Sequence, residues 1–281
     1  MDGRRRLDAR QVVIETGVVS QTSGSARCRV TGGTDVLVGI KCEIGNIEAE
    51  DSDRGRVVCN VECSPSASQQ YEGKGADEIN NELTQIMNRF LGGSQSGIDL
   101  VKLCIVPGQH CWVINIDAMI LDYGGNAVDA LFIATRAALF NTRIPKTVVQ
   151  DVGDGQVEFE VLDDVEQADR LEGMENIPLC VTVNRLGLKY IIDATPYEEL
   201  CTEARLHIAV NPAGELCGVQ KGGDGGIQPD LFREMVQTAR TLGQAMIKKL
   251  DQRLKEEEED VTAKREKGVM VEKLGFFAEL Q

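Results

Sequence analysis

A pair of glycines at a predicted strand-to-helix junction could bind a phosphate through backbone amides. The segment LDYGGNAVDALFIATRAALFNTR reads as a short apolar strand, Gly124 and Gly125, and then an amphipathic helix. Glycine lets the backbone turn sharply and approach a ligand, and the free N–H groups of a helix N-terminus attract an anion. A phosphate-using enzyme would place a hydroxyl and a cation next, but Asn126 and Ala127 follow here, and Asp129 adds a carboxylate that we expect to repel phosphate. The pattern predicts an anion site that holds no anion.

A group of acids in the segment YIIDATPYEELCTEA could also do chemistry: Asp193, Glu198, Glu199 and Glu203. Paired acids at the end of a strand can hold magnesium or act as a general acid. The structural alternative is that Asp193 ends a strand, Thr195 begins a turn, and the glutamates start a helical turn where their charge is favourable. The chain has only two histidines, and no cluster of His, Cys and carboxylates has metal-ligand spacing. We therefore expect no metal and no other cofactor.

Charge limits what the chain can bind by itself. The formal net charge is −15, whereas a protein that binds nucleic acid alone is usually basic. Any role with RNA must rest on partners or on a local basic patch, such as a loop around Lys74, for which simple solvation is the alternative. The unbroken acidic run from Glu256 to Asp260 is expected to be a solvated helix end.

The elements that must hold these residues follow from the apolar patterning. In the first half, valine- and isoleucine-rich segments predict strands, with Gly32 and Gly33 at a tight hairpin, and a helical stripe has Asp77 as a possible N-cap. The predicted strands are 11–15, 25–30, 35–43, 57–64, 101–106 and 112–121, and the predicted helices are 76–91 and 127–142.

The second half repeats this order. After a polar, acidic crossing at 146–176, strands are predicted at 179–184, 188–193, 205–211 and 215–220, and a long helix from Pro229 to Leu254. We expect residues 255–267 to be disordered, before an apolar end. The chain therefore predicts an α+β fold of two similar β-sheet/helix subdomains, 1–145 and 177–254, with the crossing between them and an acidic tail at 255–281.

Composition is that of an ordinary soluble globular protein. The 281 residues are 42% hydrophobic and 27% charged, and no run of 18 apolar residues predicts a membrane span. The N-terminus lacks the apolar stretch of a secretory signal. The nine cysteines are an odd number without a C-x-x-C pair, which is typical of reduced core cysteines in a cytosolic or nuclear protein.

Several segments together resemble the RNase PH family. The opening DGRRRLDARQVVIETGVVSQTSGSARCRVTGGTDVLVGIKCEI is similar to the start of family members, and LDYGGNAVDA and YIIDATPYEE are more similar to the non-catalytic ring subunits of the RNA exosome than to the enzymes. The resemblance runs from about residue 2 to residue 250. It implies the RNase PH-like fold with its two related subdomains.

For activity, the resemblance implies a loss. Active members cleave RNA from its 3′ end with phosphate, which they hold on Gly-Gly-Thr/Ser-Arg beside a catalytic aspartate. Asn126 and Ala127 stand at the positions of the hydroxyl and the arginine, Thr195 at that of the catalytic aspartate, and Ala76 at that of a further arginine. Arg89 matches an arginine with which the archaeal non-catalytic subunit helps to hold RNA. The alternative for Arg89 is a solvated residue near a helix end.

The resemblance also implies partners and a location. We expect a catalytically inactive subunit in a hetero-hexameric ring of RNase PH-like proteins, which threads RNA from RNA-binding cap subunits to a separate hydrolytic exonuclease. The expected location is the nucleus, including the nucleolus, and the cytoplasm, with no membrane contact. The alternatives are an active phosphorolytic 3′–5′ exoribonuclease and an adaptor that works outside the exosome.

Overall fold

The computed structural model describes residues 3–47, 53–68, 71, 73–92, 97–153, 156–162 and 167–266. Its first sheet has six strands, in the order β1-β2-β3-β6-β4, with β5 paired to β6. Only β4 runs parallel to its neighbour, and the other pairs are antiparallel. The strands are β1 (Val12–Thr16), β2 (Gly24–Val30), β3 (Thr34–Asn46), β4 (Arg56–Cys63), β5 (Cys104–Val106) and β6 (His110–Asp122). The β2–β3 pair confirms the hairpin predicted at Gly32 and Gly33.

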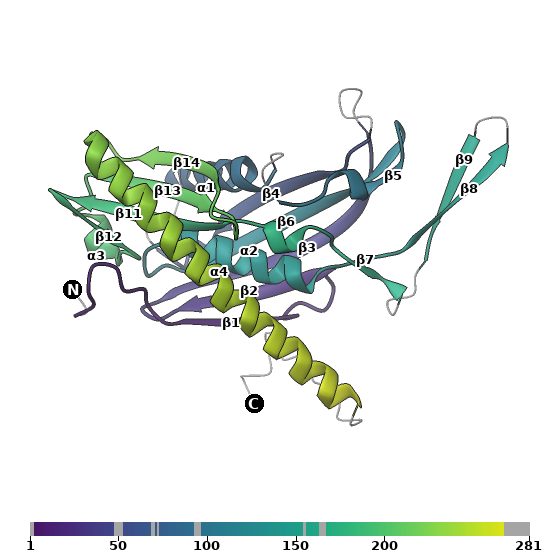
Figure 1. Ribbon diagram of the computed structural model, residues 1–281, viewed down its shortest axis with the longest axis horizontal. Coiled ribbons are helices and arrows are strands. Elements are labelled where there is room, and N and C mark those ends of the chain that lie inside the picture. The colour runs from purple at the N-terminus through teal and green to yellow at the C-terminus, as the bar shows by residue number, and fades with distance from the viewer. Residues whose placement is uncertain are drawn as a thin grey trace.

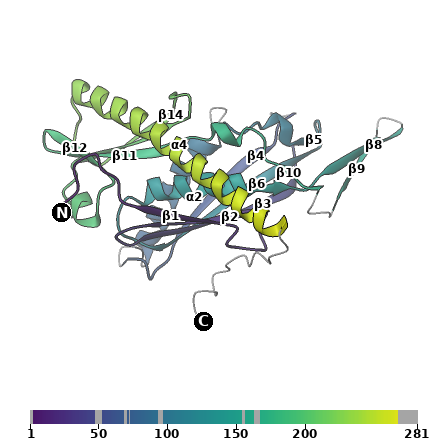
Figure 2. The same cartoon turned by 60° about the horizontal axis from the view of Figure 1, so that its bottom comes forward.

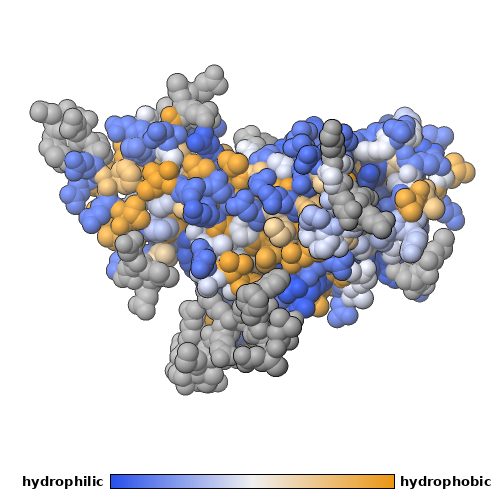
Figure 3. All heavy atoms as spheres, turned by 180° about the vertical axis from the view of Figure 1, so that it is seen from behind, coloured by the Kyte–Doolittle hydropathy of each residue, from blue (hydrophilic) through white to orange (hydrophobic). Residues whose placement is uncertain are grey.

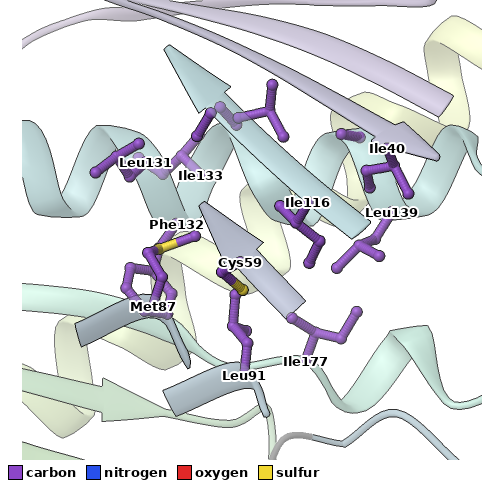
Figure 4. Packing of buried hydrophobic residues seen from close by; sticks show 14 of the residues in the cluster. Ile40, Cys59, Met87, Leu91, Ile116, Leu131, Phe132, Ile133, Leu139 and Ile177 are labelled. Carbon is purple, nitrogen blue, oxygen red and sulfur yellow. The ribbon is translucent and has the colours of Figure 1, made fainter. Parts of the chain in front are cut away.

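Two helices pack their apolar sides on this sheet. They are α1 (Lys74–Leu91) and α2 (Ala127–Asn141). In α2 every residue from Ala127 to Leu139 is buried, because the helix lies between the first sheet and the second. Figure 4 shows Met87 of α1 beside Phe132 of α2, and Leu91 of α1 beside Cys59 of β4.

The second sheet has four strands in the order β12-β11-β13-β14, all antiparallel. The strands are β11 (Leu179–Leu186), β12 (Lys189–Ile192), β13 (Ala204–Val210) and β14 (Leu216–Gly222). One face packs on α2, and the other is covered by the long helix α4 (Pro229–Glu266), which crosses the front of the molecule in Figure 1. A short helix, α3 (Pro196–Glu199), follows β12. The succession of sheet, helix, sheet and helix confirms the predicted α+β class.

The segment between the sheets differs from the expected polar crossing. Strands β7 (Arg143–Ile144) and β10 (Asp169–Arg170) pair with each other, and β8 (Thr147–Gly153) and β9 (Gln156–Val161) form an antiparallel ribbon that extends away from both sheets (Figure 1). Apolar residues alternate with acids along β9, which is the period of a strand. The acidic composition masked this alternation. A short 3₁₀ helix, η4 (Met174–Asn176), leads into β11.

The helix end expected at Glu256–Asp260 is confirmed, but the expected disorder of residues 255–267 is wrong as far as Glu266. Instead of being disordered after Leu254, α4 continues to Glu266, and Figure 2 shows it running on past β2 and β3. The Thr16 hydroxyl donates to Glu257 over 2.9 Å, and Glu258 accepts hydrogen bonds from Arg143 and Arg170. Part of the acidic run therefore pairs with the body of the molecule. The apolar end, residues 267–281, lies outside the described residues.

Three smaller expectations also need correction. Helix α1 begins two residues before the predicted start and its N-cap is Gly73, so Asp77 lies in the first turn instead of capping it. The predicted strand 101–106 begins as a 3₁₀ turn, η2 (Val101–Leu103), and only then becomes β5. No helix of the described residues is long and apolar enough to cross a membrane.

Candidate functional site

The glycine pair lies where predicted, between β6 and α2, but its space is filled by the chain itself. Gly125 has φ +83°, and a Cβ there would collide with the backbone of Ala194. A Cβ on Gly124 would collide with the backbone of Gly32, in the β2–β3 turn. Asn126, at the N-cap of α2, has φ +59°. The small residues thus admit two other backbone segments.

A buried ion pair between Arg10 and Asp193 anchors this loop. The Arg10 guanidinium donates to the Gly124 and Gly125 carbonyls over 2.6 and 3.0 Å and to Asp193 Oδ1 over 2.6 Å. Arg4 adds a hydrogen bond of 3.1 Å to Asp193 Oδ2. Burial raises the pKa of Asp193, but the hydrogen bonds and positive charge of Arg10 outweigh it and leave the pKa below its ordinary value. Asp193 is therefore a structural anchor between the N-terminal segment, the loop and the end of β12.

Asp129 does not face an incoming anion, which corrects our expectation of repulsion. It is buried and points at β11, where Oδ1 accepts from the Thr182 hydroxyl over 2.6 Å and Oδ2 accepts from the Thr182 amide over 3.0 Å. Asn126 also donates to Oδ2, over 2.9 Å. Burial raises the pKa of Asp129 to about 6, although these hydrogen bonds oppose the rise. The buried network continues from Thr182 to His207 Nδ1, 2.9 Å away.

The carboxylate that reaches the loop is Glu199. Its Oε1 accepts a hydrogen bond of 2.8 Å from the backbone N–H of Asn126, at the N-terminus of α2. Its Oε2 accepts one from the Tyr123 hydroxyl. Burial, followed by the nearby Glu199 charge, raises the pKa of Tyr123, so the phenol stays protonated and donates. A carboxylate of the chain thus occupies the position that the glycine pattern predicts for an external anion.

The four clustered acids have separate partners. Asp193 pairs with Arg10, and Glu199 binds the loop. Glu198 completes a capping box with Thr195. Glu203 lies 3.0 Å from Arg185. In the described part of the chain, no three such side chains are placed to hold a metal. This arrangement matches the structural alternative for the cluster.

Similarity to known proteins supports the family predicted from these motifs. Residues 8–145 match domain 1 of the 3′ exoribonuclease family, RNase PH, and residues 176–241 match domain 2. The chain belongs to the RNase PH family. Among its RNase PH-family relatives is a Dictyostelium discoideum protein provisionally named exosome complex exonuclease RRP42, which is 36% identical over 91% of this chain and 92% of the relative. The exosome complex component Rrp42 of Methanothermobacter thermautotrophicus is 35% identical over 89% of both.

Solved structures agree with this RNase PH assignment. A chain of the Archaeoglobus fulgidus exosome with RNA bound to the active site is 29% identical, with a TM-score of 0.73 over 89% of this chain and 91% of that one. A chain of an archaeal exosome core is 27% identical, with a TM-score of 0.69 over 89% and 90%. The two-part RNase PH fold predicted from the sequence is therefore confirmed.

The two cations predicted to line an RNA path are not brought together in this RNase PH chain. Lys74 and Arg89 stand at opposite ends of α1, about 22 Å apart at 1.5 Å per residue. Arg89 is exposed and has no ion pair among the described residues, and the side chain of Lys74 lies outside them. Just before α1, Tyr71 packs edge-on against Tyr123, the residue that precedes the glycines, with ring centroids 5.4 Å apart.

Sequence reasoning missed Arg10, Tyr123 and Thr182, and it gave the role of Glu199 to Asp129. Arg10 and Thr182 belong to the hydrogen-bond network of the loop although they lie far from it in the sequence, so no local spacing could identify them. Tyr123 directly precedes the glycines. The one available signal was that the N-terminus of a helix favours a nearby carboxylate. Both Glu199 and Asp129 could supply that carboxylate.

Proposed function

We propose that this chain is a catalytically inactive, structural subunit of an RNA exosome ring, in which it helps to form the channel that threads RNA to a separate 3′–5′ exonuclease. Relatives that carry exosome names align along most of their own length and most of this chain, which supports membership of such an assembly. The related archaeal exosome structure has RNA bound to its active site. The proposal gives this chain a place in the ring without a working site of its own.

The observation that carries the inactivity is that the glycine loop is closed by the chain's own groups. Asn126 and Ala127 stand where the resemblance places a hydroxyl and an arginine, and the Asn126 amide is bonded to Glu199. Thr195, at the position of the catalytic aspartate, is the N-cap of α3, and its hydroxyl lies 3.0 Å from Glu198. A threonine hydroxyl held in this way supplies no acid for the leaving group.

Exposed apolar side chains support obligate assembly. Leu188, Tyr197 and Leu200 are 84%, 82% and 84% exposed, although large apolar side chains usually avoid such contact with water. Figure 3 shows apolar areas breaking the hydrophilic surface on the side of the molecule away from α4. We propose that RNase PH-like ring neighbours cover such surfaces, and that the completed ring receives RNA-binding cap subunits and a hydrolytic exonuclease.

The proposed location is the nucleus, including the nucleolus, and the cytoplasm. All nine cysteines are free thiols, and most are buried or half-buried, which suits a reducing compartment. A fluorescent tag at the native locus, combined with fractionation of nuclei, tests the location. Restriction to a secretory compartment would contradict it.

The decisive experiment is an exonuclease assay of the purified full chain on single-stranded RNA, with phosphate, with magnesium and with both. We expect no release of nucleoside diphosphates or monophosphates. Gly125→Val is the control, because a side chain there collides with the backbone of Ala194. Activity that persists unchanged in this variant comes from a contaminant. Activity that disappears with it belongs to the chain and supports the alternative, an active phosphorolytic exoribonuclease.

A further inference from the structure

Hydrogen-bond donors surround the place where Glu199 meets the glycine loop. The Asn126 amide and the Tyr123 hydroxyl both donate to its carboxylate. The Arg205 guanidinium is close enough to lower the pKa of Tyr123 against the larger effects of burial and of Glu199. This environment favours a negative charge, because it combines the Asn126 backbone N–H, the Tyr123 hydroxyl and the Arg205 guanidinium.

A further donor, on the strand beside Arg205, has no partner among the described residues. Asn184 is buried at 2% exposure, and its Nδ2 makes no hydrogen bond among the described residues. In the sheet register Asn184 lies opposite Arg205, and alternate side chains of a strand share a face, so Asn184 is on the face of Thr182. That face meets the first turn of α2, because Thr182 binds Asp129. A buried, unsatisfied amide donor is costly, and an anion with several oxygens would supply an acceptor.

The position of Glu199 is fixed by its own helix. The capping box between Thr195 and Glu198, with Pro196 at the start, holds the single turn of α3 in place. The neighbouring negative charge at Asp193 is neutralised by Arg10 and Arg4. Among the described residues, the carboxylate of Glu199 is the anionic group that accepts a hydrogen bond from the backbone N–H of Asn126, at the N-terminus of α2.

We propose that Glu199 is a built-in anion, which fills an oxyanion-binding site at the N-terminus of α2 and keeps inorganic phosphate out. This inference rests on the proposed function, because it names the residue that blocks phosphate in an inactive subunit. Removing the Glu199 side chain leaves the Asn126 backbone N–H, the Tyr123 hydroxyl and the charge of Arg205, with Asn184 opposite Arg205, for a tetrahedral oxyanion. Phosphate binding does not restore cleavage, because Thr195 still supplies no acid.

The test compares the wild-type full chain with Glu199→Ala and Glu199→Gln, each purified with whatever ring subunits accompany it. The readouts are ³¹P line broadening and the phosphate dependence of Tm, against chloride at equal ionic strength. We expect phosphate to bind Glu199→Ala at least about tenfold more tightly than wild type, which corresponds to about 1.4 kcal/mol. Glu199→Gln keeps the volume and loses the charge, so its gain is smaller. Glu203→Ala removes a charge from the same group of acids, where its half-exposed side chain pairs with Arg185 and does not touch the loop amide, so it is the matched control and should behave like wild type.

The outcomes separate this inference from the proposed function. If the folded Glu199→Ala and Glu199→Gln proteins respond to phosphate as wild type does, the site does not exist and the inference is wrong. A gain that also occurs in Glu203→Ala reflects net charge alone and overturns the inference equally. Should Glu199→Ala fail to fold by circular dichroism, Glu199→Gln decides by itself. Phosphorolysis by the wild-type chain would instead refute the inactive subunit, whichever result the variants give.

Discussion

Charged side chains have different surroundings at the glycine loop and in the last turn of α1. At the loop, Arg10 and Asp193 are buried and bonded to each other, and Glu199 occupies the free amide of α2. In the last turn of α1, Arg89 is exposed and pairs with no acid of the described residues. Charge at the loop therefore holds the fold together, whereas charge at the end of α1 remains available to an external anion. In the proposed inactive subunit, the loop connects parts of the fold, and any contact with RNA would fall to exposed residues such as Arg89.

The first way to break this comparison is to remove a buried charge from the loop. Arg10→Ala leaves Asp193 buried with only the Arg4 side chain as a charged partner and removes the two Arg10 hydrogen bonds to the carbonyls of Gly124 and Gly125. Breaking a buried ion pair in this way typically costs about 3–5 kcal/mol. We expect the free energy of unfolding to fall by that amount. Urea denaturation followed by the fluorescence of Trp112, the only tryptophan and a buried residue of β6, measures it.

Arg233→Ala is the matched control for this experiment. Arg233 pairs with Asp230 on α4, but the two side chains are 80% and 94% exposed. Pairs of this kind contribute about 0.5 kcal/mol or less. An Arg10→Ala protein as stable as Arg233→Ala would mean that the loop does not depend on its buried charge, and the comparison would fail.

A second prediction sharpens the comparison through His207, a buried side chain of the loop network that the folded protein keeps uncharged. Burial, and to a smaller extent Arg205, lowers the pKa of His207 from 6.5 to about 4. Unfolded chains protonate this histidine below pH 6.5 and the folded protein does not, so its contribution to stability is complete above that pH and is lost as pH falls towards 4. We expect the unfolding free energy of wild type to drop relative to His207→Gln by about 3 kcal/mol at most over this range.

The comparison with His207→Gln is needed because Asp129 acts in the opposite direction. Its pKa is raised to about 6 by burial, so its contribution is complete below the unfolded value and is lost as pH rises through 6. The two effects offset each other in the wild-type profile, and the difference between wild type and variant isolates the histidine. Parallel pH profiles for the two proteins would show that His207 is protonated in the folded state, contrary to the buried network.

The strands and helices that position the loop could be predicted from the sequence because their signals are local. The alternation of valine and cysteine along β4 and the glycines between β2 and β3 each indicate their element within a few residues. Acidic composition hid the same alternation in β9. It also made the end of α4 look disordered, although Glu257 and Glu258 bind Thr16 and Arg143.

The site was harder because its partners come from far along the chain. The glycine pattern correctly placed a helix N-terminus that needs an anion, but a sequence cannot say which of two nearby acids supplies it. Asp129 is three residues from Asn126 and turns inward to Thr182, while Glu199 is 73 residues away and reaches the amide. Arg10 gave no signal, since its importance lies in contacts with Gly124 and Asp193 that only the fold creates.

The smallest expected effect concerns Arg89, the open side of the comparison. A net charge of −15 means that the isolated chain should bind RNA poorly at physiological salt, because binding through counterion release needs several clustered cations. Within an assembled ring, basic neighbours would supply most of the field, and one exposed arginine adds a single phosphate contact. We expect Arg89→Glu in a reconstituted ring to weaken retention of single-stranded RNA several-fold, about 1 kcal/mol, with assembly unchanged. Filter binding and nuclease protection at two salt concentrations measure it, and Arg233→Glu, the same reversal on α4, should leave both unchanged. Equal retention by the two variant rings would identify Arg89 as a solvated residue that only favours the end of its helix.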